Sequence, residues 1–240
     1  LNRRTAQWAG QGVLLWPSLA DPVDRGTIRQ GWRGDHEAPV LWTEWGDPGD
    51  AQGVRVRQEV FARVPGAGDV ESGVEPLLTW IRTSIRQATP KDAASGKCTF
   101  SYRLYGPAIG RNMVMESNLN YPWKPYPRRL RFEPASAGRP WACLRESGNR
   151  IRLAVAASQG CRLEFRPDPK ECVVQIEFDI KVGARLDIVL PMIPASEEVL
   201  GKECQLGFDQ ALAKSDAYWK KVPATGATIR VPEAGLNEAI

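Results

Sequence analysis

The sequence lacks most of the side-chain patterns on which enzyme sites are built. Its 240 residues include one histidine, His36, and no G-x-S-x-G segment, so neither a Ser-His-Asp nor a Cys-His nucleophilic site is indicated. The segment GQGVLL has Leu15 where a dinucleotide-binding fingerprint needs its third glycine, and no phosphate-binding loop is present. We therefore predict no cofactor, no metal and no catalytic residue for this chain. His36, between Asp35 and Glu37, is interpreted as part of a solvated loop.

The cysteines do not form the pairs or spacings that disulfide frameworks and zinc sites use. There are five, an odd number, and no C-x-x-C segment occurs. Four of them fall in the apolar phase of predicted strands, where a thiol behaves as a small hydrophobic group; the five are Cys98, Cys143, Cys161, Cys172 and Cys204. We interpret them as free core thiols. The compartment remains open, with a periplasmic or secreted location favoured over a cytoplasmic one.

Long apolar runs and strong net charge are also missing. No apolar stretch approaches the roughly 20 residues that a membrane-spanning helix needs, so no membrane partner is predicted. The net charge is +4. The arginines of RRLRF and RIRL alternate with apolar residues, which predicts that Arg129, Arg131, Arg150 and Arg152 lie on the solvent face of strands. A basic tail or a nucleic-acid-binding motif does not accompany them, so nucleic acid is not a predicted partner.

The main pattern in the sequence is an alternation of apolar and polar residues with a period of two. It is clearest at 54–64 and 172–182, where apolar and polar residues take turns. Further strands are predicted at 13–17, 39–45, 76–86, 97–105, 112–117, 128–133, 140–145, 150–157, 161–166 and 185–190. About twelve short strands without intervening helices favour two antiparallel sheets packed face to face.

One helix is predicted, late in the chain. Ser196 can cap its first turn, in which Glu197 and Glu198 complement the helix dipole. Gly201 and Gly207 are expected to interrupt it. Beyond Gly207, residues at i, i+3 and i+4 form one apolar stripe, made up of Phe208, Ala211, Leu212, Ser215, Tyr218 and Trp219.

The segment NYPWKPYPRR at 120–129 is the most site-like part of the sequence. Three prolines stiffen a loop that carries Tyr121, Trp123 and Tyr126. Rigid aromatic faces with polar edges suit sugar rings or a protein partner. The alternative is that these rings cover one end of the sandwich or pack on a neighbouring domain.

The end of the sequence carries a family resemblance. The order of LDIVLPMIP (186–194), a helix ending in YWKK (218–221) and GATIRVPEAGLNEAI (226–240) resembles the linker region of bacterial six-hairpin glycosidases. The resemblance implies a β-supersandwich at 1–195, followed at 196–240 by a linker helix, a short strand and the start of a first helix of an (α/α)6 barrel. In that family the catalytic acid and base lie on barrel loops, which these 240 residues lack.

The expectation is therefore a non-catalytic β-sandwich domain of a multidomain carbohydrate-active enzyme. It would brace a helical barrel supplied by the same or a partner chain, with Tyr218 and Trp219 at the domain interface. An oligosaccharide or polysaccharide is a further possible partner. Two alternatives stay open: an autonomous carbohydrate-binding module that uses Tyr121, Trp123 and Tyr126, or a structural sandwich that docks a partner and binds no sugar.

Overall fold

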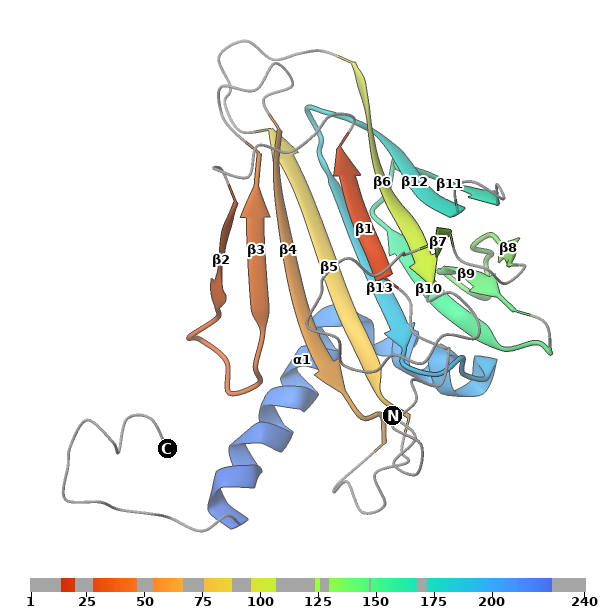
Figure 1. Cartoon of the computed structure of the whole chain (residues 1–240). Coiled ribbons are helices and arrows are strands. Elements are labelled where there is room, and N and C mark those ends of the chain that lie inside the picture. Colours follow the sequence, from red (N-terminus) through yellow and green to blue (C-terminus); the bar gives the residue numbers. More distant parts are fainter. Residues whose placement is uncertain are drawn as a thin grey trace.

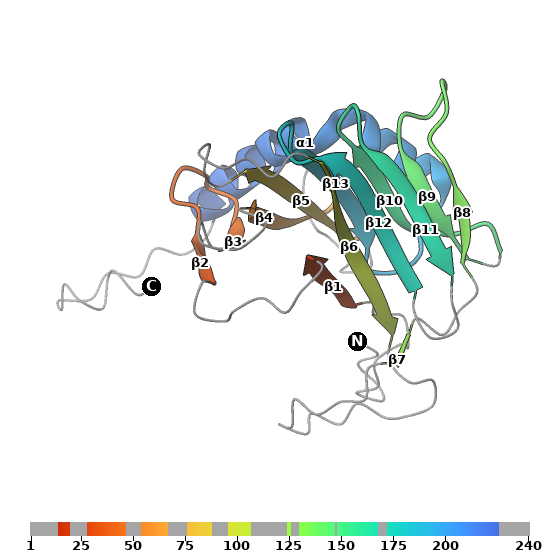
Figure 2. The same ribbon diagram turned by 90° about the horizontal axis from the view of Figure 1, so that it is seen from above.

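Two antiparallel β-sheets pack face to face, and one long helix lies against the outer face of the larger sheet (Figure 1). Figure 2 shows the three layers from above, with the smaller sheet on the side opposite the helix. The computed structural model describes residues 14–19, 28–46, 54–66, 76–87, 96–106, 124–125, 130–146, 148–167 and 172–225. The predicted fold class, a mostly β two-sheet sandwich followed by a helix, is confirmed.

The larger sheet has eight strands in the order β2-β3-β4-β5-β13-β10-β9-β8. Their bounds are β2 Arg29–Trp32, β3 Leu41–Trp45, β4 Val54–Arg63, β5 Leu78–Gln87, β8 Arg131–Glu133, β9 Ala142–Arg145, β10 Ile151–Ala157 and β13 Ala184–Pro191. The smaller sheet has the order β1-β6-β12-β11, and β7 pairs with β6. Its bounds are β1 Leu14–Leu19, β6 Lys97–Gly106, β7 Lys124–Pro125, β11 Arg162–Pro167 and β12 Cys172–Asp179.

The alternation predicted from the sequence produces the core between the two sheets. One parity of each central strand faces inward, so that β4 contributes Val56, β6 contributes Phe100 and β12 contributes Ile176, all completely buried. Tyr102 also lies in this core, where Gln58 Nε2 donates a hydrogen bond of 2.6 Å to its hydroxyl and Thr83 Oγ1 forms a second one. A buried hydroxyl needs such partners to offset its lost hydration.

A second core lies between the larger sheet and helix α1 (Glu197–Thr225). The outward parity of β5 supplies Trp80, and β4 supplies Phe61; both pack against Phe208 of the helix. The helix bends at Gly207, whose backbone has φ 70° and ψ 169°, a conformation that favours glycine. Gly207 therefore interrupts α1 as predicted, whereas Gly201 remains helical and that part of the prediction is wrong.

Strand β10 contains an irregularity that reverses one prediction. Its register with β9 shifts between Ile151 and Leu153, so that Ile151 faces the helix while Leu153 faces the inter-sheet core. The intervening Arg152 is completely buried and donates a 3.0 Å hydrogen bond to Glu146. The prediction that Arg152 faces solvent is therefore wrong, because a bulge breaks the period of two. Arg131 and Arg150 are exposed as predicted.

Other differences from the predicted elements concern short or interrupted strands. Strands β2 and β7 were not predicted, since each is too short to show alternation. The run at 172–182 ends as a strand at Asp179, because the amides of Val182 and Gly183 bond to the Asp179 carbonyl in a turn. Val182 is consequently 78% exposed instead of buried. The strand predicted at 112–117 and Arg129 lie outside the described residues.

Candidate functional site

Helix α1 is attached to the sheet by a buried acidic residue, Glu203. Its side chain is 3% exposed and its Oε1 lies 2.7 Å from Arg63 Nε, forming an ion pair. The indole nitrogen of Trp80 donates a 3.0 Å hydrogen bond to the same oxygen. A buried carboxylate is costly unless it is paired and hydrogen-bonded, and Glu203 has both kinds of partner. These contacts fix the first half of α1 over β4 and β5.

Arg82 fixes the helix just after its bend. Its guanidinium bonds to Asp187 of β13 at 2.8 Å and to Asp209 of α1 at 2.6 Å, and it lies 4.1 Å from the centre of the Phe208 ring. Burial by itself would lower the pKa of Arg82, but the two carboxylates outweigh it and raise the pKa above its ordinary value. Arg82 therefore remains a cation that links strand and helix.

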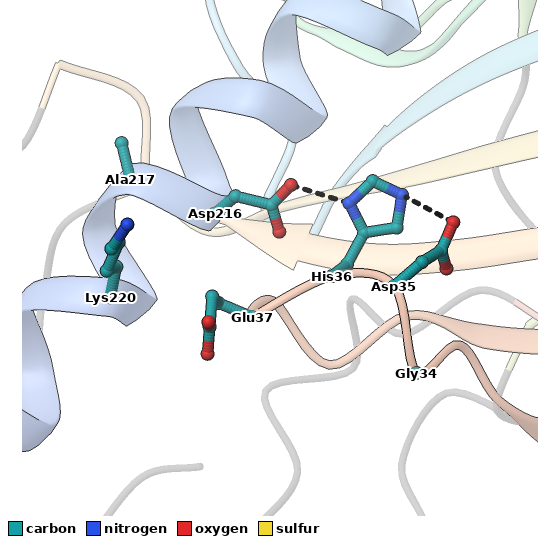
Figure 3. Close-up of a pocket in the computed structure, with 7 residues that line it drawn as sticks. All are labelled: Gly34, Asp35, His36, Glu37, Asp216, Ala217 and Lys220. Carbon is teal, nitrogen blue, oxygen red and sulfur yellow. Dashed lines mark hydrogen bonds and ion pairs between the residues drawn. The ribbon is translucent and has the colours of Figure 1, made fainter.

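The second half of α1 forms one wall of a polar cavity of about 410 Å³. The opposite wall is the connection between β2 and β3, residues 34–37, and the helix contributes Asp216, Ala217 and Lys220 (Figure 3). We call this space the loop–helix cavity. Its charged groups come from segments far apart in the sequence, and only the tertiary fold brings them together.

Asp216 joins the two walls of the loop–helix cavity. Its Oδ2 lies 2.6 Å from His36 Nδ1, and its Oδ1 accepts a 2.9 Å hydrogen bond from the backbone amide of Ala38. Because an ionised carboxylate can only accept, Nδ1 carries a proton. The pair holds the imidazole of His36, which is 19% exposed, in one orientation. The solvated-loop interpretation of His36 misses this contact.

Asp35 is held beside the imidazole by a separate set of ion pairs. Arg33 donates to both carboxylate oxygens of Asp35 and, at 3.2 Å, to Glu59 of β4. The hydrogen bond from Arg33 lowers the pKa of Asp35 to about 2, so this carboxyl is ionised at neutral pH. Asp35 Oδ2 lies 3.8 Å from His36 Nε2, which is beyond hydrogen-bond distance.

A second, mostly apolar cavity of about 200 Å³ lies on another side of the same helix segment. Its lining includes Leu77 before β5, and Tyr218 and Trp219 of the helix. The two aromatic rings meet edge to face with their centres 5.8 Å apart. Trp219 is 37% exposed, whereas Phe208, Ala211, Leu212 and Ser215 of the predicted stripe are buried. The stripe is thus covered by the sheet except at its C-terminal end.

Further exposed apolar residues follow β13, next to Leu77 of this cavity. Met192 donates its backbone amide to the Leu77 carbonyl at 2.9 Å, and both Met192 and Ile193 are more than half exposed. Trp219, Leu77, Met192 and Ile193 are here called the apolar strip. Lysines of α1 lie beside it, since Lys214 lines the cavity and Lys221, two residues after Trp219, is exposed.

The predicted site residues have different outcomes. The structure brings Tyr218 and Trp219 together on the apolar cavity, and their role as a domain interface stays a prediction. Tyr121, Trp123 and Tyr126 lie outside the described residues. The five cysteines all lie among the described residues and form no disulfide, and Cys98, Cys143 and Cys172 are buried. Within the described ranges, no cluster of three or more His, Cys, Asp or Glu side chains is arranged to hold a metal ion.

Sequence reasoning did not find the His36–Asp216 pair. The two residues are 180 positions apart, and no local pattern connects a loop residue to a distant helix. The sequence shows only that His36 is the one histidine of the chain. That fact does not indicate which residue it contacts.

A scan against protein-family models and a search of curated proteins find no match to this chain. Among the described residues, no helix has the length and hydrophobicity needed to span a membrane.

Proposed function

We propose that this chain is the non-catalytic β-sandwich domain of a multidomain carbohydrate-active enzyme, and that its apolar strip docks a helical catalytic domain. The carbohydrate class rests on the resemblance at 186–194, 218–221 and 226–240. The docking role rests on one structural observation, the exposed Trp219 beside an apolar cavity at the end of the sandwich. Large apolar side chains gathered at an exposed surface mark interaction sites.

The arrangement of α1 supports a docking role. Its inward stripe is already buried against β4 and β5, so the strip is additional apolar surface at the margin of the helix. Arg63, which also lines the apolar cavity, already has Glu203 as its counter-ion. Lys214 has no ion pair with another described residue. The complementary partner surface is therefore apolar at its centre, with carboxylates opposite Lys214 and Lys221.

A comparison of two samples tests this proposal: the 240-residue chain alone, and the chain together with the helical domain proposed as its partner, either linked to it or added as a separate chain. Hydrogen exchange should show that peptides covering Leu77 and Trp219 are protected when the helical domain is present and exchange faster in the 240-residue chain alone. Trp219→Ala should reduce this protection, whereas Trp32→Ala, at an exposed tryptophan that lines neither cavity, should leave it unchanged.

Activity assays supply the second test. The 240-residue chain should hydrolyse no aryl glycoside or oligosaccharide, because the acid and base belong to the docked domain. Turnover by the purified 240-residue chain that is lost when its own acids are changed to amides would contradict the proposal. A gene that encodes no helical domain, in this chain or a co-expressed partner, would contradict it as well.

A further inference from the structure

The loop–helix cavity contains polar groups that the attachment of the loop to the helix does not use. That attachment needs Asp216, the Nδ1 side of His36 and the amide of Ala38. It leaves His36 Nε2, Glu37 and Lys220 unbonded among the described residues, although all three residues line the cavity. Figure 3 shows Glu37 on the loop wall and Lys220 on the helix wall.

The imidazole is oriented as it is in a binding site. Because Nδ1 donates to Asp216, Nε2 is the ring nitrogen left for a ligand: it accepts a hydrogen bond in the neutral ring and donates one in the protonated ring. Asp35 Oδ2 lies 3.8 Å from Nε2, and that carboxylate can only accept. A ligand hydroxyl between them could donate to either group. The ion pairs of Arg33 with Asp35 and Glu59 hold this side of the cavity in place.

The charges of the lining exclude two ligand classes. Three carboxylates, those of Asp35, Glu37 and Asp216, face one lysine, Lys220, so phosphate and other anions are repelled. A divalent cation has no suitable set of three ligands among the described residues. A neutral ligand with several hydroxyl groups fits, because its hydroxyls can donate to Nε2 and the carboxylates and accept from Lys220. The volume of about 410 Å³ lies within the range of small-molecule sites.

We infer that the loop–helix cavity binds one or two sugar rings of a saccharide through His36 Nε2, Glu37 and Lys220. The choice of a saccharide among polyhydroxylated ligands rests on the proposed function. The site is separate from the apolar strip, since Ala217 and Lys220 face one cavity while Tyr218 and Trp219 line the other. Sugar binding and domain docking can therefore fail independently.

The test titrates the 240-residue chain with a panel of neutral monosaccharides and disaccharides, using ligand-detected NMR and calorimetry. At least one sugar should bind, with a dissociation constant on the order of millimolar. Lys220→Met and Glu37→Gln should each weaken that binding about tenfold or more, because each removes a charged hydrogen-bond partner. Both positions are exposed and make no contact needed for folding. Lys221→Met is the matched control, because Lys221 is exposed but does not line the cavity.

Three results would overturn the inference. The first is that no sugar of the panel binds the native chain. The second is that the two cavity variants bind as well as the Lys221→Met control. The third is that Trp123→Ala alone abolishes binding, which would assign the sugar to the 120–129 segment. Protection of Trp219 by the helical domain is a separate measurement, so none of these three results decides the proposed docking role.

Discussion

His36 Nδ1 lies 2.6 Å from Asp216 Oδ2, and this contact joins the β2–β3 connection to the second half of α1 across 180 residues of sequence. The same carboxylate accepts a hydrogen bond from the backbone amide of Ala38, and Ala38 is almost completely buried. A buried amide without a partner costs about 1–3 kcal/mol. Asp216 therefore stabilises the position of a loop as well as that of a helix.

Asp216→Ala should lower the free energy of unfolding by about 1–2 kcal/mol, because it leaves the Ala38 amide and the imidazole without an acceptor. Urea denaturation measures the loss, and hydrogen exchange of the Ala38 amide should accelerate. Asp216→Asn keeps one acceptor oxygen and should lose less. Glu198→Ala is the control; its pair with Lys202 is exposed, so it should change stability by no more than about 0.5 kcal/mol. Unchanged exchange at Ala38 in Asp216→Ala would show that the contact does not hold the loop.

Glu203→Gln should destabilise the protein by about 2–3 kcal/mol, since it leaves Arg63 without a counter-charge at a site with little solvent access. The amide oxygen of glutamine can still accept from Trp80. The double variant Glu203→Gln with Arg63→Met should recover part of the loss, because it removes the unpaired charge as well. Thermal or urea unfolding of the four proteins in a double-mutant cycle measures the coupling. Equal destabilisation of the single and double variants would contradict the ion-pair explanation.

The buried Tyr102 predicts a loss of stability at high pH. Burial raises the pKa of Tyr102 to about 12, although hydrogen bonds from Thr83 and Gln58 oppose the shift. The unfolded chain releases this proton near pH 10, so the stabilisation is complete below pH 10 and is lost as the pH rises towards 12. It amounts to about 2–3 kcal/mol. Ultraviolet titration should show one phenol that ionises last, and Tyr102→Phe should remove that step. Ionisation of all tyrosines together, without unfolding, would disprove this.

Glu133 predicts a loss of stability at low pH. Hydrogen bonds from Arg145 and Arg139 lower the pKa of Glu133 from 4.5 to about 2. A lowered pKa gives stability that is present above pH 4.5 and is lost as the pH falls towards 2. Glu133→Gln should therefore be less stable than the native chain at pH 7, and the difference should shrink at pH 2–3. Urea midpoints at several pH values measure it. A difference that is independent of pH would show that Glu133 acts through packing rather than charge.

The fold class could be predicted from the sequence because its signal is local and repeated. Alternation at 54–64 and 172–179 depends on the geometry of each strand, and the same alternation builds the core between the sheets. The bend at Gly207 was also predictable, since glycine accepts the left-handed backbone found there. Where one residue disturbs the period, as at Arg152, the local pattern assigns the wrong face.

What the sequence by itself determined is therefore where the long strands lie, which stripe of α1 is apolar and that one histidine is available. The tertiary structure alone decided that His36 meets Asp216, that Glu203 meets Arg63, and that Trp219 stays uncovered while Phe208 is buried. The physical reason is that local periodicity records the orientation of a side chain relative to its own backbone. A cavity depends on which distant segments pack together, and that is settled by the whole chain.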